Sequence, residues 1–528
     1  MRRSLARASA VMTVGTVLSR VTGLLRLAAI VAAIGVAESK LADTFNLANT
    51  APNIIYELVL GGVLTSVFVP VFVELLQEEG KERAWRVISA VMNLSVVILV
   101  AITTLAVLAA PWIARFYAAR CNGCAVQQQE VLTFLLRMFL PQIVFYGLAA
   151  LTAGLLNANR RFAAPMYTPV LNNLAVIGVF LAFYNAYGRV TLDGITRSQL
   201  LLIGLGTTGG VILMAIAQVP FMRGLGRYQL TFDASHPAVK KLVKLSAFVI
   251  AYVITNQIGY LTVQWLANRQ QGGYSAYVAA FTFFILPQGL FAVSIFTALL
   301  PSMSEHAVNE RWAEFRERLS MGVRSTFFLI LPAAVGYFVL GEPVVRLLQH
   351  GVMTPRSTEL VASVLRIFVL GLVPFSIYQL FLRAFYAIQD TRTPFLINCV
   401  TTVVNIGINI PMFGVWGVRG LALGHAASYT VGVVLQARAL RRRVGGLDLA
   451  HVTRSAAKVA VAAVGMGALV WLVSRVAESL ITPTGFAQQV ALVVAPVAVG
   501  AVAYLGLAAL VQAEELVQVR GLVARRST

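Results

Sequence analysis

The sequence predicts an all-α polytopic membrane protein with about 14 transmembrane helices. Hydrophobic residues make up 58% of its 528 residues and charged residues 12%, whereas a soluble domain is about 25% charged. Apolar runs of about 20 residues, the length that crosses a bilayer as a helix, recur along nearly the whole chain. A membrane β-barrel would instead show alternating segments of about 10 residues.

The expected spans follow the apolar runs in chain order. The basic N-terminal end resembles a leader peptide, but Arg20 and Arg26 interrupt the apolar run that follows, so we expect an uncleaved first helix. The loops are short, and we expect no separate soluble domain. The spans cover about 8–34, 44–76, 87–113, 129–156, 164–185, 199–221, 243–267, 275–302, 322–341, 358–387, 393–412, 416–437, 455–474 and 486–511.

The net charge of +21 has a topological explanation. If the N-terminus is cytoplasmic, 28 of the 42 Lys and Arg side chains fall on the cytoplasmic side and 10 on the other, with 4 inside spans. The positive-inside rule then places both termini in the cytoplasm. This asymmetry accounts for most of the basicity, so we expect membrane lipids rather than nucleic acid as partners.

An internal repeat divides the chain. Residues 136–139 (Leu-Arg-Met-Phe) match residues 365–368 (Leu-Arg-Ile-Phe) at an offset of 229, and Ala158 and Pro165 match Ala387 and Pro394 at the same offset. We expect two six-helix lobes, 1–232 and 233–443, followed by two added helices and a tail, 444–528. Because six is even, the lobes share one orientation, and such repeats hold the substrate site between them.

A polar stripe marks the second predicted helix. At about 100° per residue, its members lie within about 60° of Asn46. Charge inside a membrane is costly and usually faces a partner or a wet cavity, so we expect this stripe to line a cavity. Arg20 and Arg26 of the preceding helix could bind a phosphate, pair with an internal acid, or extend to a membrane interface. The stripe comprises Asp43, Asn46, Asn49, Asn53 and Glu57.

Other polar features have weaker functional meaning. Asn256, Asn405 and Asn409 could bind a cation through amide oxygens, but hydrogen bonding between helices is favoured because no acid accompanies them. Cys121 and Cys124 could form a local disulfide or remain two unpaired loop thiols. The formal GxGxxG at 204–209 lies in a predicted span, where close helix packing explains it better than a dinucleotide site. We find no catalytic constellation and expect no enzyme activity.

Several stretches resemble the MurJ/MviN lipid II flippases of the multidrug/oligosaccharidyl-lipid/polysaccharide exporter superfamily. They run in order over about 1–443, and the last two spans match only in number. The stretches are SRVTGLLR, ADTFNLANTAPN and GGVLTSVFVPVF at the first two helices, LLNANRRFAAPMYTPVLNN, FTALLPSMS, GEPVVRLLQHGVMTP, FLRAFYAIQDTRTPFLINCVTTVVNIGIN and GLALGHAAS.

The resemblance implies transport of lipid II to the outer leaflet by alternating access, for peptidoglycan synthesis. By position, Arg20, Arg26 and Asp43 match family residues, and we expect Asn46, Asn53 and Glu57 to meet the polar head. Cell-wall synthesis proteins are the candidate protein partners. We expect no cofactor, with membrane potential or sodium as the driver. The alternatives are a flippase for another polyprenyl-diphosphate sugar and a cation-coupled drug exporter, whose cavity should be acidic.

The chain also departs from the family pattern. Many members carry a basic pair where Tyr56 and Glu57 stand here, an arginine where Thr282 stands, and an acid where Leu27 stands. The acidic sodium ligands of some members correspond to Asn256, Asn405 and Asn409. The resemblance therefore implies a diphosphate site with fewer arginines and weakens the case for sodium coupling.

Overall fold

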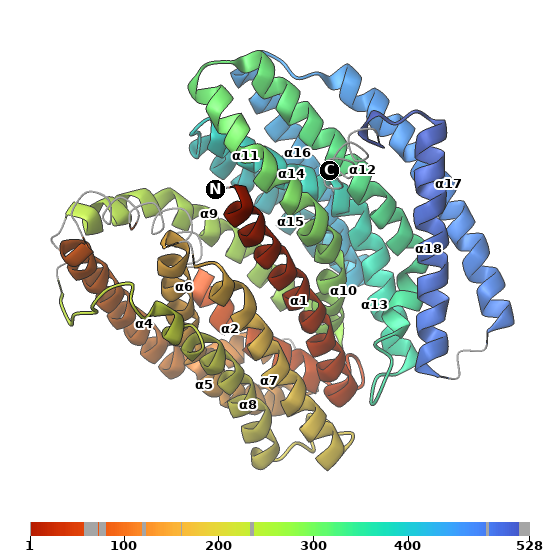
Figure 1. The fold of residues 1–528 in the computed structure, drawn as a ribbon. Helices are drawn as coiled ribbons and strands as arrows, with labels where there is room; N and C mark the ends of the chain where they lie inside the picture. The colour runs from red at the N-terminus through yellow and green to blue at the C-terminus, as the bar shows by residue number, and fades with distance from the viewer. Residues whose placement is uncertain are drawn as a thin grey trace. The chain divides into compact units, whose positions relative to one another are not determined.

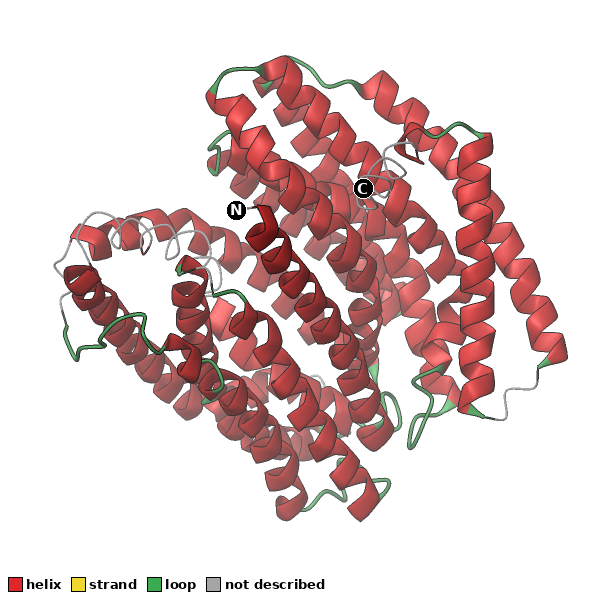
Figure 2. Ribbon diagram, viewed as in Figure 1, coloured by secondary structure: helices red, strands yellow, loops and turns green. Residues whose placement is uncertain are grey.

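The computed structural model describes residues 2–57, 72, 81–118, 123–159, 161–232, 237–481 and 485–516. Within these ranges the regular structure is entirely helical (Figure 2). The chain forms two compact units, which we describe separately. Unit 1 comprises Met1–Ser275 and His350–Met353, and unit 2 comprises Ala276–Gln349 and Thr354–Thr528.

Unit 1 is a bundle in which α1 packs along α7, α7 packs on α8, and α2 packs on α5 and α6 (Figure 1). Phe45 of α2 is fully buried, with its ring against Phe139 and Phe180 at centroid distances of 5.6 and 5.1 Å. Its helices are α1 (Arg2–Ile34), α2 (Leu41–Tyr56), α4 (Lys81–Ala118), α5 (Ala125–Phe139), α6 (Gln142–Ala158), α7 (Ala163–Tyr187), α8 (Arg197–Ile216), η3 (Val219–Met222), α9 (Pro237–Ala267) and the start of α10 (Gly273–Pro287).

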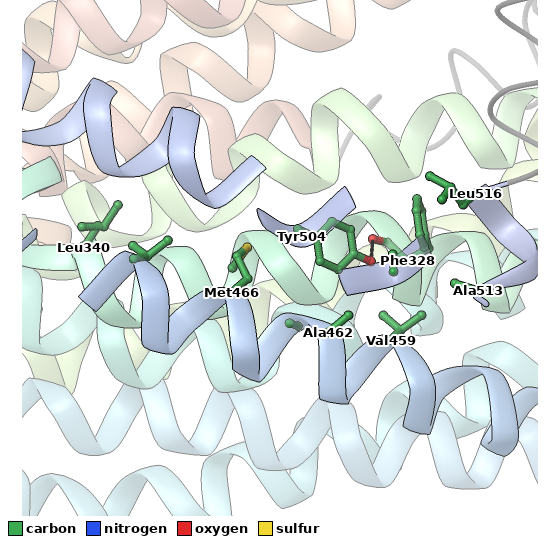
Figure 3. Packing of buried hydrophobic residues seen from close by; sticks show 11 residues of the cluster. Phe328, Leu340, Val459, Ala462, Met466, Tyr504, Ala513 and Leu516 are labelled. Carbon is green, nitrogen blue, oxygen red and sulfur yellow. Dashed lines mark hydrogen bonds between the residues drawn. The ribbon is translucent and has the colours of Figure 1, made fainter. Parts of the chain in front are cut away.

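Unit 2 continues α10 and packs α12 against α13, α14 and α17, and α15 against α16. Its last two helices, drawn blue in Figure 1, share a core with α12. Figure 3 shows Met466 and Tyr504 in this core, where the Tyr504 hydroxyl donates to the Phe328 carbonyl at 2.7 Å. The remaining helices are η4 (Gln288–Ala292), α11 (Val293–Val308), α12 (Trp312–Arg346), α13 (Pro355–Phe368), η5 (Val369–Gly371), α14 (Leu372–Ala387), α15 (Arg392–Trp416), α16 (Val418–Arg443), α17 (Leu449–Leu480) and α18 (Phe486–Leu510).

Twelve helices in the described part of the chain are long and apolar enough to span a membrane. They coincide with twelve of the expected spans. The other two expected spans fall on α2 and α9, and residues 58–71 of the first of them lie outside the described residues. The chain is therefore a multi-pass helical membrane protein, as the sequence predicted.

Helix boundaries recur at the offset that relates the sequence repeats. Helices α5 and α13 end at Phe139 and Phe368, and α7 and α15 begin at Ala163 and Arg392. Both α7 and α15 run for 25 residues and stop at a glycine of positive φ, Gly188 at 62° and Gly417 at 58°, a conformation that side-chain-bearing residues rarely adopt. The boundary between the two compact units falls after Ser275, near the start of α10, whereas the expected boundary between the lobes falls at residue 232, before α9. The two six-helix lobes stay a prediction.

Two of the three glycines in the 204–209 motif lie close to neighbouring helices. A Cβ at Gly206 would lie 2.4 Å from the Val179 side chain of α7, and one at Gly204 would lie 3.1 Å from the Met138 side chain of α5, whereas a Cβ at Gly209 would have no neighbour within 4 Å. Small residues allow helix backbones to approach this closely in a membrane. The interpretation of this motif as helix packing is confirmed at Gly204 and Gly206.

Candidate functional site

The polar stripe of α2 changes its surroundings along the helix. Asp43, in the first turn, has 0% of its surface exposed. Asn46, Asn49 and Asn53 are half-buried, and Glu57, directly after the helix, is exposed. One helix face therefore begins inside the packed unit and ends at an accessible surface of unit 1.

Asp43 is the centre of a closed hydrogen-bond network within unit 1. Its Oδ1 accepts from both the backbone N and the Oγ of Ser275 at 2.9 Å. Its Oδ2 accepts from the backbone N of Gly272 at 2.8 Å and from Lys40 Nζ at 3.1 Å. Four donors occupy the carboxylate, and Asp43 pairs with Lys40 rather than with either arginine of α1, which the sequence had offered as alternatives.

Lys40 extends this network to the segment between α9 and α10. Its ammonium donates to the carbonyl oxygens of Asn268 and Gln270 at 2.5 and 3.0 Å. Gln128 of α5 joins the Asn268 side chain through two hydrogen bonds of 3.0 Å. A buried ion pair is tolerated when its remaining donors and acceptors are satisfied. The network fixes the start of α2 to its neighbours. Lys40 and Gln128 were missed by the sequence reasoning because neither belongs to the stripe.

Arg26 lies where the stripe becomes accessible. The half-buried Arg26 side chain interacts electrostatically with the Tyr146 hydroxyl of α6. The Tyr146 side chain in turn shares a hydrogen bond with the Asn53 side chain. The Tyr56 ring packs 5.9 Å from the Tyr146 ring. Three helices thus bring Arg26, Tyr146, Asn53 and Tyr56 into one cluster, which we call the Arg26 cluster.

The Arg26 cluster carries a cation without an anionic partner in the described part of the chain. No described carboxylate lies within 4.0 Å of the guanidinium of Arg26. A guanidinium presents five donors in a fork that suits a phosphate. Tyr146 escaped the sequence reasoning because one tyrosine in an apolar helix gives no signal. Only the fold places its hydroxyl beside Arg26 and Asn53.

Arg20 and Asn46 have local settings of their own. Asn46 Nδ2 donates to Ser275 Oγ at 3.0 Å, at the edge of the Asp43 network. Arg20 is half-buried on α1, and among the described residues no acid lies within 4.0 Å of it. Beside it, Asn173 of α7 donates to the Ser19 carbonyl and to Thr22 Oγ1 at 3.3 and 3.0 Å, which ties α1 to α7.

The three asparagines suggested as cation ligands divide between the units. Asn256 is half-buried on α9 in unit 1. In unit 2, Asn409 Nδ2 donates to Asn405 Oδ1 at 2.8 Å, and Asn405 Nδ2 donates to Ser428 Oγ of α16 at 3.4 Å. Only Asn409 Oδ1 of this pair is buried without a partner. Because hard cations need several oxygen ligands, the pair does not fit a sodium site by itself. It joins α15 to α16.

Two further observations bear on metals and thiols. Over the ranges that the structure describes, no group of three or more His, Cys, Asp and Glu side chains could hold a metal ion. Cys124 takes part in a disulfide bond, and Cys121 lies outside the described residues. The alternative of an unpaired Cys124 thiol is therefore wrong.

Comparison with known proteins decides the family. A family model described as "Lipid II flippase MurJ" matches residues 30–513. The chain belongs to the MurJ family. It is 30% identical over 463 residues to a "Probable lipid II flippase MurJ" of Rhizobium meliloti, covering 87% of this chain and 85% of that protein. It is also 30% identical to the Haemophilus influenzae protein of that name, covering 86% and 90% of the two chains.

Solved structures show the same fold. The chain aligns with a structure titled "Lipid II flippase MurJ, inward closed conformation" with a TM-score of 0.76 and 22% identity, over 94% of this chain and 98% of that one. It aligns with an inward-facing multidrug resistance MATE transporter of the MOP superfamily with a TM-score of 0.68 and 15% identity, over 80% and 94% of the two chains.

Positions at which this MurJ family member departs from the family pattern have defined surroundings. Tyr56 contributes its ring to the Arg26 cluster, and Glu57 follows it on the accessible end of the stripe. Thr282, in unit 2, is half-buried and donates its hydroxyl to the Val278 carbonyl of its own helix at 2.8 Å. The basic pair that the resemblance implies after Asn53 is replaced by an aromatic residue, Tyr56, and an acidic one, Glu57.

Proposed function

We propose that this protein moves lipid II, a polyprenyl-diphosphate-linked glycopeptide, from the cytoplasmic to the outer leaflet of a bacterial cytoplasmic membrane by alternating access. Diphosphate and sugar-peptide groups cannot cross hydrocarbon unaided, because unpaired charge and polar groups are costly there. A polar cavity supplies partners for the head while the lipid tail stays in the bilayer. Family membership and the Arg26 cluster support this proposal.

The Arg26 cluster carries the proposal. Its guanidinium has no carboxylate within 4.0 Å among the described residues, so an incoming diphosphate need not displace an internal acid. The Tyr146 hydroxyl and the Asn53 amide stand beside it as neutral hydrogen-bonding groups. We assign Arg26 as the diphosphate anchor, with Tyr146 and Asn53 as groups that position the anion.

The remaining stripe residues divide between two roles. Asn46 and Glu57 meet the polar sugar-peptide head along α2. Arg20 adjusts the electrostatics of the cavity from α1. Asp43 acts through the Lys40 network, which holds the start of α2 while its accessible end exchanges partners with substrate.

Orientation and driving force complete the proposal. With both termini in the cytoplasm, export of an anionic head runs down an inside-negative potential, which yields about 2.3 kcal/mol per charge per 100 mV. Membrane potential is therefore the proposed driver, with a sodium gradient as the alternative. Cell-wall synthases that consume lipid II are the proposed protein partners.

The test is lipid II exposure on the outer face of bacterial cells depleted of their own flippase and supplied with this protein. We expect wild type to restore exposure. Arg26→Ala should lower the amount of exposed lipid II at least about tenfold, since a charge-assisted hydrogen bond contributes about 1.5–3 kcal/mol. Arg189→Ala, which removes an exposed arginine between α7 and α8, is the matched control. Membrane levels of each variant are measured in parallel.

The outcomes separate the two parts of the proposal. Full exposure with a stably inserted Arg26→Ala variant would show that Arg26 is not the anchor. If even wild type fails to restore exposure while inserting stably, lipid II is the wrong substrate. Other polyprenyl-diphosphate oligosaccharides are then tested in the same cells, because their diphosphates present the same anion. A cationic drug is disfavoured by the Arg26 charge, which has no carboxylate within 4.0 Å among the described residues.

A further inference from the structure

Unit 2 contains an apolar trough along α12. Phe327, Leu331 and Phe338 of α12 form one wall, with side chains of η5, α14 and α16 opposite. The cavity holds about 460 Å³, and Thr430 is its one polar lining residue among those the structure describes. Phe327 and Phe338 are eleven positions apart, about 16 Å along a helix. This is about half of the ~30 Å hydrocarbon core, the depth of one leaflet.

A basic mouth adjoins the trough. A second cavity of about 620 Å³ shares Phe338 with the trough and is lined by Arg346, Arg366 and Arg475. On α12 the lining residues continue from Phe338 to Glu342 and Arg346 at a spacing of four residues, which keeps them on neighbouring parts of one helix face. On the other wall, Arg366 of the mouth precedes Leu370 of the trough by four residues. Trough and mouth therefore form one groove, which we call the unit 2 groove.

The charges in the mouth do not cancel. Glu342 pairs with Arg346 at 2.8 Å and with Arg366 at 3.5 Å, so one carboxylate faces two guanidinium groups. Arg475 lies 5.8 Å above the Trp471 ring, and no carboxylate among the described residues lies within 4.0 Å of it. With Glu478 included, the mouth has three cations and two anions, which leaves one positive charge in excess.

We propose that the unit 2 groove is a binding site for an anionic phospholipid, with one acyl chain in the apolar trough and the phosphate held by Arg366 and Arg475. An apolar cavity that runs into a basic mouth matches a molecule with a hydrocarbon chain and an anionic head. The site lies wholly in unit 2 and uses no residue of the Arg26 cluster, so it is independent of the proposed transport route.

The groove also has a structural consequence. Arg366 comes from α13 and Arg475 from α17, so one phosphate would bridge the penultimate helix to the rest of unit 2. A ligand that binds only the folded state raises stability by mass action. Bound phospholipid should therefore stabilise the docking of α17 on α12 and raise the melting temperature of the whole chain.

The test is lipid binding by the purified full-length protein in neutral detergent, measured by native mass spectrometry and by the shift in melting temperature. The probes are phosphatidylglycerol, phosphatidylcholine, undecaprenyl phosphate and inorganic phosphate. We expect phosphatidylglycerol to bind and to raise the melting temperature, and the other three to do so at least about tenfold more weakly.

Two groove variants and one control sharpen the test. Arg366→Gln with Arg475→Gln should weaken phosphatidylglycerol binding at least about tenfold. Leu370→Trp, which fills the trough without changing charge, should weaken it as well. Arg356→Gln, an exposed arginine of α13 outside the groove, should not.

Each contrary result overturns the proposal. Equal shifts with inorganic phosphate would indicate a free-anion site, and equal shifts with phosphatidylcholine would remove the role of charge. A preference for undecaprenyl phosphate would assign the groove to polyprenyl lipid. Retained binding in both groove variants, or no lipid binding by wild type, would also refute it.

Discussion

A charged side chain lies at each end of the α2 stripe, but the two have opposite surroundings. Asp43 is sealed, with four hydrogen bonds and a lysine partner. Arg26, beside the accessible end, has a tyrosine hydroxyl and no described acid as its partner. A buried charge with every partner in place serves structure, whereas an unneutralised charge at an accessible surface is available to a ligand. The neighbours, rather than the residue types, separate the two roles.

Breaking the sealed end should have the largest effect. Asp43→Ala leaves the Lys40 ammonium buried without its carboxylate, and removing one partner of a buried pair costs about 3–5 kcal/mol. We expect the free energy of unfolding, measured by denaturant titration in detergent, to fall by about that amount. Asp193→Ala, which removes an exposed acid between α7 and α8, should change it by less than about 0.5 kcal/mol.

The double variant Lys40→Met with Asp43→Leu separates charge from packing. Replacing both partners of a buried pair by apolar residues is often neutral, so this variant should recover most of the lost stability. If Asp43→Ala unfolds at the wild-type denaturant concentration, the network does not hold the start of α2 and the comparison between the two ends fails.

Probing the accessible end should affect transport more than stability. Tyr146→Phe removes the hydroxyl that shares a hydrogen bond with Asn53 and interacts electrostatically with Arg26, but keeps the ring that packs on Tyr56. A neutral hydrogen bond contributes about 1 kcal/mol, so lipid II exposure at limiting protein should fall about fivefold. Tyr187→Phe, at an exposed position at the end of α7, is the control. Unchanged exposure with Tyr146→Phe would remove the hydroxyl from the site.

The sequence predicted the class of fold and much of its internal order. Apolar run length locates twelve spans that the structure describes, and the 229-residue offset recurs in the helix boundaries. Helical periodicity also identified the stripe, because a periodic pattern is a property of one helix. It could not find Lys40 or Tyr146, since their roles depend on contacts between helices that only the fold brings together. Nor could it show that Asp43 is sealed while Glu57 is exposed.

Another ionic cluster of unit 2, around Arg324, combines a buried carboxylate with an exposed one. Arg324 of α12 bonds to Glu514 at 2.7 Å and to Glu515 at 3.1 Å, just beyond α18. Glu515 is 3% exposed and also accepts from Ser455 of α17 at 2.8 Å. Glu514 is 57% exposed and bonds to His451 at 2.9 Å. The cluster ties the last two helices to α12 with one buried and one solvated carboxylate.

The solvated carboxylate should give the smallest effect, and a pH-dependent one. The hydrogen bond from His451, followed by its charge and by Arg324, holds the pKa of Glu514 below its ordinary value of 4.5. A carboxyl whose pKa is lowered by folding binds its proton more readily in the unfolded state. Its contribution to stability is therefore complete above about pH 4.5 and is lost as the pH falls through the lower, folded-state pKa. Because Glu514 is largely exposed, solvent screening keeps this contribution small.

The measurement is the melting temperature of wild type and Glu514→Gln between pH 3 and 7. Wild type should be slightly more stable than the variant at pH 6, and the two curves should converge toward pH 3. Glu478→Gln, at an exposed acid near the other end of α17, should give no such convergence. A wild-type advantage that stayed constant down to pH 3 would mean that Glu514 titrates alike in the folded and unfolded chains. The cluster would then hold the last two helices through Glu515 alone, as a sealed carboxylate of the kind found at Asp43.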